Sequence, residues 1–252
     1  MRKILLASGC SFTFEKWNWP TFVAEELDMD LLNVGMGSQG NGLISKKTIY
    51  SVTELLKTYK SEDILVGIMW SGVDRYEFHI DFNNHTDREI YKQNIDGWFE
   101  NPTDVVPGHK NWIIANPHWN SSYSLNWYEN YHTNIGSMVN TLQYILLTQF
   151  FLEKNNIKYF MTTYMDIFYK QNISHNNYIT NNVETKYLYD MINFDKFVPI
   201  IGCHEWVKEH YEYNGGFNPP DNKGIIGVHP TEFGHKRFSN EVLVPFIKDN
   251  IL

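Results

Sequence analysis

The residues that most constrain the fold lie near the amino terminus, where a short apolar run ends in a turn. Ile4 to Ala7 are apolar and are followed at once by Ser8-Gly9. Such a run bounded by a turn signal is typical of a buried strand. The next polar nucleophile is Ser11, so we expect its hydroxyl at the carboxyl end of the first strand, the edge where open α/β sheets carry their sites. Alternatively, Ser11 only caps a helix, because serine is a favoured N-cap residue.

Further apolar runs alternate with amphipathic segments along the rest of the chain. The expected strands are Leu31–Val34, Asp63–Trp70 and Ile157–Tyr164, and the expected helices are Thr21–Leu27, Leu43–Tyr59, Asn134–Lys154 and Glu232–Ile247. Strands and helices in alternation imply a parallel sheet with right-handed crossovers. A chain of 252 residues that is 42% hydrophobic can form one such domain. We therefore predict a single α/β domain, a three-layer α/β/α flavodoxin-like sandwich around a parallel sheet of about four or five strands.

The stretch from about residue 76 to residue 133 does not follow this alternation. It is rich in Asn, Asp and His, and four tryptophans (Trp98, Trp112, Trp119 and Trp127) are spread through it. A structureless loop of this length is rare in a compact domain unless it is functional, so we predict an inserted cap or lid over the carboxyl edge of the sheet. Its aromatic and amide side chains suit sugar stacking, or the tryptophans form the small core of the cap itself.

The loop GMGSQGN at residues 35–41 follows the second expected strand. It matches the dinucleotide fingerprint G-x-G-x-x-G, but that motif belongs after the first strand of its unit. The acidic residue expected about 20 positions later would be Asp63, which instead opens the third strand. We favour another role, in which a glycine amide approaches a developing negative charge with no Cβ in the way.

Two motifs at opposite ends of the chain resemble the SGNH (GDSL-like) hydrolases. GCSFT at residues 9–13 is similar to the first block of that family, and HPTEFGH at residues 229–235 is similar to the last. The resemblance implies that Ser11 is the nucleophile and His229 the general base. It also implies an oxyanion hole that contains the backbone amides of Ser11 and Gly37, and a structural role for His235.

The third block departs from the family pattern, because the asparagine that usually supplies a third oxyanion donor is missing. The chain has WSGVDR at residues 70–75 instead, similar to a branch with Trp-Ser or Trp-Thr followed by Arg. We expect the Ser71 hydroxyl to act as the third donor. We expect Trp70, Arg75 and Asn41 to bind substrate, or Arg75 to form a surface ion pair with a neighbouring acidic residue.

The acid that would orient His229 is less evident. The family usually has an aspartate two or three residues before this histidine, but those positions hold glycine and isoleucine here. Asp221 is the nearest upstream carboxylate and Glu232 the nearest downstream. We predict either a triad with Asp221 or a dyad of Ser11 and His229.

These features predict a serine esterase or deacylase that works through an acyl-serine intermediate, on an ester such as an O-acylated carbohydrate. One alternative is a non-catalytic module that binds a glycan or a partner, which the missing asparagine and the missing local aspartate favour. Another is an O-acyltransferase that uses the same residues, because sugar hydroxyl and water are interchangeable acyl acceptors in this chemistry.

The composition of the chain limits which partners we expect it to bind and where in the cell we expect it. A formal charge of −8 argues against general nucleic-acid binding and against anionic membranes. Two cysteines are no disulfide framework, and we expect no metal and no cofactor, since the histidines lack metal-ligand spacing. The apolar run at the amino terminus is shorter than a signal peptide needs, and no segment reaches a membrane span. We therefore expect a soluble, cytoplasmic protein.

Overall fold

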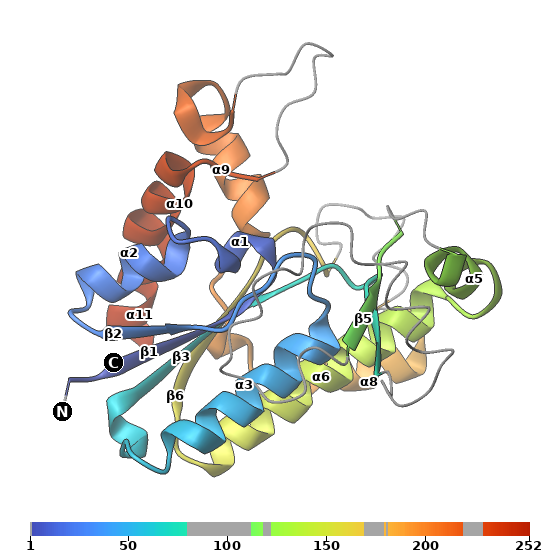
Figure 1. The fold of residues 1–252 in the computed structure, drawn as a ribbon, viewed down its shortest axis with the longest axis horizontal. Helices are drawn as coiled ribbons and strands as arrows, with labels where there is room; N and C mark the ends of the chain where they lie inside the picture. The colour runs from blue at the N-terminus through green and yellow to red at the C-terminus, as the bar shows by residue number, and fades with distance from the viewer. Residues whose placement is uncertain (1, 80–111, 118–121, 169–178, 180, 219–228) are drawn as a thin grey trace.

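Four parallel strands form the central sheet of the computed structural model, and helices cover both of its faces (Figure 1). The strands are β1 (Ile4–Gly9), β2 (Asp30–Asn33), β3 (Ile64–Trp70) and β6 (Lys158–Thr163), and their order is β2-β1-β3-β6. This is the flavodoxin-like order of a doubly wound sheet. The structure describes residues 2–79, 112–117, 122–168, 179, 181–218 and 229–252.

The helices form two layers because β1 and β3 are apolar on both faces. One layer contains α3 (Asn41–Leu55) and α6 (Asn134–Lys154), and α8 (Val183–Asp190) packs on α6. The other layer contains α2 (Trp19–Glu26), α9 (Cys203–Tyr211), α10 (Glu232–Phe238) and α11 (Val244–Asn250). Alternate residues of β1 serve the two layers: Ile4 and Leu6 belong to the core under α3 and α6, whereas Leu5 and Ala7 belong to the other core. The predicted three-layer sandwich is therefore confirmed.

The ends of the long helix α6 have clear local causes. Thr133 is its N-cap, and the Thr133 hydroxyl accepts a hydrogen bond from the Gly136 amide at 3.0 Å. The helix ends at Asn155, and Asn156 has a positive φ of 53° that reverses the chain. The sequence predicted both ends. The terminal helix, expected from Glu232 to Ile247, instead consists of α10, the π-helical turn η5 (Ser239–Leu243) and α11.

The inserted segment contributes a small hairpin and a helix to the described structure. The hairpin pairs β4 (Tyr76–His79) with β5 (Trp112–Ala115) in antiparallel fashion, and the helix is α5 (Ser122–Asn130). Trp127 of α5 stacks on Tyr76 with ring centroids 4.1 Å apart and packs against Phe78. This tryptophan therefore belongs to a local aromatic core. Trp112 opens β5, where its ring packs against His79 at 5.1 Å. Trp98 and Trp119 lie outside the described residues, and the lid stays a prediction.

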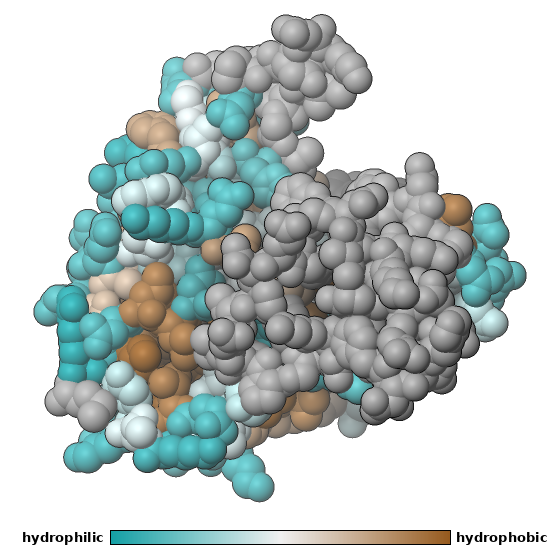
Figure 2. Space-filling model, viewed as in Figure 1, coloured by the Kyte–Doolittle hydropathy of each residue, from teal (hydrophilic) through white to brown (hydrophobic). Residues whose placement is uncertain are grey.

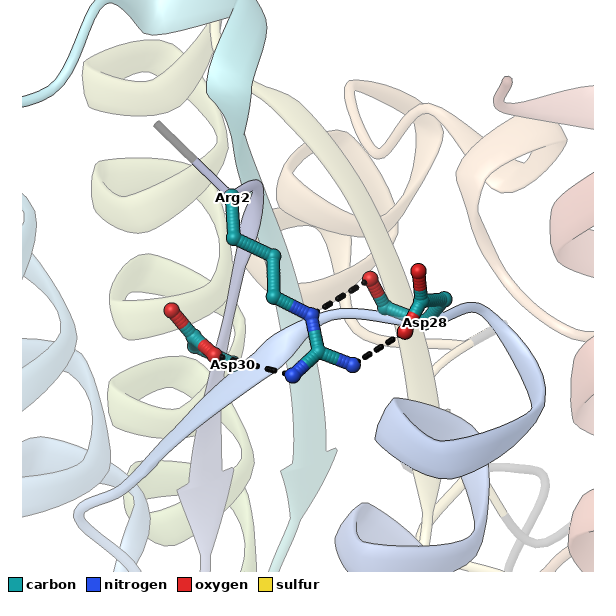
Figure 3. A network of polar contacts seen from close by, with 3 residues as sticks. All are labelled: Arg2, Asp28 and Asp30. Carbon is teal, nitrogen blue, oxygen red and sulfur yellow. Dashed lines mark hydrogen bonds and ion pairs between the residues drawn. The ribbon is translucent and has the colours of Figure 1, made fainter.

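The amino edge of the sheet is held by charged side chains (Figure 3). Arg2, just before β1, forms ion pairs with Asp28 and Asp30 and donates from Nε to the Asp28 carbonyl at 3.1 Å. These groups are exposed, so each pair contributes only about 0–1 kcal/mol. The cluster ties the start of β1 to the start of β2, which keeps the two strands in register toward the opposite, carboxyl edge.

Apolar surface is visible near the edge of the sheet. The brown atoms of Figure 2 gather where β1 and β2 lie in Figure 1, and Leu31 of the edge strand β2 is 37% exposed.

Among the helices that the structure describes, none is long and apolar enough to cross a membrane.

Candidate active site

The turn after β1 presents Ser11 at the carboxyl edge of the sheet. The Cys10 carbonyl accepts hydrogen bonds from the amides of Thr13 and Phe14 at 2.9 and 3.1 Å, which closes the short helix α1 (Ser11–Phe14). The N-cap position is occupied by Cys10, with no side-chain cap, so the alternative role of Ser11 as a cap is wrong. Asn18 donates to the Ser11 carbonyl at 2.8 Å and leaves the partly exposed hydroxyl to other partners.

The Ser11 hydroxyl meets His229, which lies 218 positions further along the chain. Ser11 Oγ and His229 Nε2 are 2.7 Å apart, a hydrogen-bond distance. The backbone after His229 is fixed on both sides: Pro230 forms a bridge with Phe217, and Thr231 N-caps α10 by accepting from the Gly234 amide at 3.2 Å. The two ends of the chain therefore meet in the geometry of a nucleophile and its base.

The surroundings of His229 favour its neutral form. The residue is exposed overall, but its ring packs against Phe12 at a centroid distance of 4.9 Å. Desolvation by the surrounding protein lowers the pKa of His229 below 6.5, the Glu15 carboxylate raises it, and the Arg75 guanidinium lowers it. Near neutral pH the imidazole is therefore free to accept a proton.

The acid beside His229 was only partly anticipated. Asp221 lies outside the described residues, so its role stays a prediction. Among the described residues, Glu15 is the carboxylate whose charge acts on the His229 ring. Glu15 follows α1 directly and is exposed. Its position four residues after Ser11, on the same turn, was the sequence signal that we missed.

The loop between β2 and α3 lies against the nucleophile turn and contains Gly37. The Gly9 carbonyl accepts hydrogen bonds from the Met36 amide at 3.1 Å and from Gln39 Nε2 at 3.0 Å. Asn33, at the end of β2, donates to the Thr13 carbonyl at 2.6 Å. Gly37 is partly exposed at the turn of this loop, so the structure brings it to the same edge as Ser11. Gln39, fully buried, is an anchor that sequence reasoning missed.

Two residues predicted to act at the third block lie inside the protein. Ser71 is fully buried, and its backbone amide donates to Asn41 Oδ1 at 2.7 Å. Asn41 Nδ2 in turn donates to the Ser71 carbonyl at 3.0 Å and to Thr141 Oγ1 at 3.1 Å. Asn41 is only 2% exposed. Both residues therefore hold the end of β3 against α3 and α6, and neither offers the accessible polar group that we expected.

Trp70 and Arg75 were also expected to bind substrate, and they lie at different depths in the protein. Trp70 is fully buried in the core and donates from Nε1 to Met161 Sδ at 3.3 Å, so it offers no surface to a substrate. Arg75 is partly buried at the carboxyl edge, where Nη1 donates to Ser71 Oγ at 2.6 Å. Within the described residues it makes no ion pair, which argues against its expected alternative role in a surface pair.

The Arg75 guanidinium is surrounded by groups of the nucleophile turn and of β6. It lies over the ring of Tyr164 at 5.4 Å, within hydrogen-bonding reach of Cys10, and 3.4 Å from the Gln39 carbonyl, to which it donates. Burial raises the pKa of Tyr164 to about 12, so this phenol stays neutral. Arg75 therefore places a cation, which makes no ion pair among the described residues, beside Cys10, the residue that precedes Ser11, and its charge lowers the pKa of His229.

The described residues contain no cluster of three His, Cys, Asp or Glu side chains that could hold a metal ion. The groups that the described residues bring to this edge include a hydroxyl, an imidazole, backbone amides and a guanidinium.

Comparison with known proteins gives a family and a weak likeness to solved structures. A solved structure of a protein from Desulfitobacterium hafniense, assigned to the G-D-S-L family of lipolytic proteins, matches with a TM-score of 0.47 and 13% identity over 94% of this chain and 96% of that chain. No curated protein matches. A family model described as "Family of unknown function (DUF6071)" matches residues 8–192, a range that includes Ser11, Gly37 and Arg75 and ends before His229. The chain belongs to this family, DUF6071.

Proposed function

We propose that this protein is a serine hydrolase that cleaves carboxylic esters through an acyl-Ser11 intermediate. The observation that carries the proposal is the 2.7 Å contact between Ser11 Oγ and His229 Nε2. A serine hydroxyl is a weak nucleophile at its ordinary pKa and needs an adjacent base. The lowered pKa of His229 keeps that base neutral near pH 7, so that it can take the proton.

The reaction needs two steps, and His229 serves both. In the first, Ser11 Oγ attacks the ester carbonyl carbon while its proton moves to His229 Nε2. The imidazolium then returns this proton to the leaving alkoxide, which departs as the alcohol and leaves the acyl group on Ser11. In the second step, water gives a proton to His229 and attacks the acyl carbon, and Ser11 leaves with its proton restored.

Negative charge on the carbonyl oxygen needs donors at the same edge. The proposal assigns the backbone amides of Ser11 and Gly37 to this task, as the resemblance to SGNH hydrolases implies. In place of the missing asparagine it assigns the guanidinium of Arg75, because this cation lies beside Cys10 and makes no ion pair among the described residues. Ser71 then acts indirectly, by holding Arg75 through its hydroxyl oxygen.

The proposed substrate class is an O-acylated alcohol, with an O-acylated carbohydrate as the specific candidate. Support comes from the aromatic and amide-rich composition of the inserted segment. An O-acyltransferase would use the same residues, and the ratio of hydrolysis to transfer in the presence of an acceptor sugar separates the two activities.

Hydrolysis of a short-chain p-nitrophenyl ester by Ser11→Ala tests the proposal. We expect the rate to fall by about 10⁴-fold or more, since removal of the nucleophile removes the covalent route. Ser61→Ala, in the turn η1 (Ser61–Asp63) that precedes β3, is the matched control and should keep the wild-type rate. Full activity of Ser11→Ala, or no turnover by the wild type, would overturn the proposal.

A further inference from the structure

A buried carboxylate lies at the start of α3, and the hydrolytic steps do not use it. Glu77 is on β4, the first strand of the inserted hairpin, and only 8% of it is exposed. Its Oε1 accepts a hydrogen bond from the Leu43 amide at 3.2 Å, and the Gly40 amide also acts on it as a donor. Gly40 is the N-cap residue of α3 and has no side chain to cap the helix, so Glu77 does this from a distant strand.

The backbone at this point is shaped for the carboxylate. A Cβ at Gly40 would lie 2.4 Å from Glu77 Oε1, and a Cβ at Gly42 would lie 2.8 Å from Oε2. Neither carboxylate oxygen has room for a side chain at these positions. Arg75 lies on the same side of Gly40, since the same added Cβ would be 3.0 Å from Arg75 Cβ. Glu77 and Arg75 thus both pack against the end of the loop that carries Gly37.

Several neighbouring groups affect the charge state of Glu77. Burial raises the pKa of Glu77 to about 7, against the lowering effects of the Leu43 and Gly40 amides, of Lys46 on α3 and of Arg75. Tyr144 of α6 packs its ring against Gly42 and completes the enclosure. The amino end of a helix favours a negative charge, so the carboxylate form of Glu77 binds these amides more strongly than the acid form does.

We propose that Glu77 is a positioning residue, whose side-chain oxygens fix the loop of residues 34–40 so that the Gly37 amide is held toward the oxygen of the reacting ester. This inference rests on the proposed function for its catalytic consequence, although the anchoring of the loop does not depend on it. The same loop is also tied to the turn after β1, through the Met36 amide near its start and through the Gln39 side chain next to Gly40. Glu77 supplies the second anchor and connects the hairpin β4–β5 to the active site.

Amide hydrogen exchange of the full-length protein tests the anchor without any substrate. The variant is Glu77→Gln, which keeps an acceptor oxygen and the side-chain volume but loses the charge. Glu54→Gln is the matched control, because Glu54 lies on the same helix and is exposed in an ion pair with Lys57. In Glu77→Gln we expect exchange at residues 36–43 to be about 10-fold faster, with the other strands and helices unchanged.

The pH dependence of the exchange protection is a second test, because a residue with a purely structural role would not produce it. In the wild type, protection of residues 40–43 should decrease as pH rises through about 7, because burial opposes the charge on Glu77 more strongly than the neighbouring amides favour it, and in Glu77→Gln it should stay flat. With an ester substrate, kcat of Glu77→Gln should fall about 10-fold while KM stays within about 2-fold, because the misplaced donor acts in the transition state.

The outcomes separate the two proposals. Unchanged exchange at residues 36–43 in Glu77→Gln would overturn the anchor, whatever the activity. Faster exchange with an unchanged kcat would overturn the catalytic consequence. A wild type without esterase activity would overturn the proposed function, and faster exchange in Glu77→Gln would still establish the anchor.

Discussion

Two serines follow two neighbouring strands of the sheet, and their surroundings are opposite. β1 and β3 are paired in parallel with Gly9 opposite Met69, so Ser11 and Ser71 both lie at the carboxyl edge. Ser11 is partly exposed, and its hydroxyl meets an imidazole at 2.7 Å. Ser71 is fully buried, and its hydroxyl oxygen accepts from a guanidinium at 2.6 Å.

The comparison shows that the partner of a hydroxyl decides what the serine can do. An imidazole can take the proton and make the oxygen nucleophilic. A guanidinium has no acceptor, so it can only occupy a lone pair of the oxygen and be held by it. We therefore expect the same residue type at the same edge to be a reactive group beside His229 and a support beside Arg75.

The largest expected difference is between alanine variants of these two serines. Ser71→Ala should retain measurable esterase activity, about 10-fold below the wild type, because it loosens Arg75 without removing the nucleophile. His229→Ala should fall by about 10⁴-fold, close to Ser11→Ala. The measurement is kcat with a p-nitrophenyl ester, and a loss in Ser71→Ala as large as that in Ser11→Ala would make the two serines equivalent and break the comparison.

Arg75→Met tests the cation that Ser71 holds. We expect kcat to fall by about 10²-fold, the loss that follows removal of one oxyanion donor, with a small change in KM. Arg75→Lys keeps the charge but not the planar donor, so it should recover part of this loss. The measurement is steady-state kinetics of the three proteins. An increase in KM alone in Arg75→Met would contradict the assignment.

Asn41→Ala tests the structural character of the region around Ser71. The amide of Asn41 satisfies both backbone groups of Ser71, so its removal leaves buried polar groups unpaired. We expect a loss of about 2 kcal/mol in the free energy of unfolding, measured by urea denaturation. Asn130→Ala, whose amide bonds only within the exposed end of α5, is the control and should change stability little. Equal effects of the two variants would remove the structural role.

The smallest predicted effects are shifts in the pH profile. Activity should rise with pH as His229 loses its proton, with a midpoint below 6.5 because desolvation lowers the pKa of His229. Glu15→Gln removes a charge that raises this pKa and should move the midpoint to lower pH, by a few tenths of a unit since Glu15 is exposed. Arg75→Met should move it to higher pH. Shifts in the same direction would contradict the electrostatic account of the ring.

The sequence predicted the sheet and the position of Ser11 at its carboxyl edge because both leave local signals. Apolar runs mark buried parallel strands, and Ser8-Gly9 marks the turn that presents Ser11. The pairing of Ser11 with His229 rested instead on a family resemblance between the two ends of the chain. No local pattern encodes a contact between residues 218 positions apart.

Some polar residues were placed wrongly from the sequence. The prediction considered only their residue type and could not tell which side chains are buried. Asn41 and Ser71 are polar and lie near predicted glycine and strand signals, yet both are buried, and the Asn41 side chain satisfies the backbone groups of Ser71 inside the core. Glu77 gave no signal of its capping role, because it lies on a strand of the insertion and caps a helix that begins 36 positions earlier in the sequence. Which distant side chain pairs with a buried backbone group depends on how the chain folds, so local sequence patterns do not reveal it.

Covalent labelling with a fluorophosphonate tests the central claim most directly. The Ser11 oxygen should form a bond to phosphorus as fluoride leaves and His229 takes the proton, and peptide mapping of the wild type should find one adduct, on Ser11. The adduct should be absent from Ser11→Ala and present in Ser71→Ala. An unlabelled wild type, or an adduct on another residue that persists in Ser11→Ala, would contradict the account.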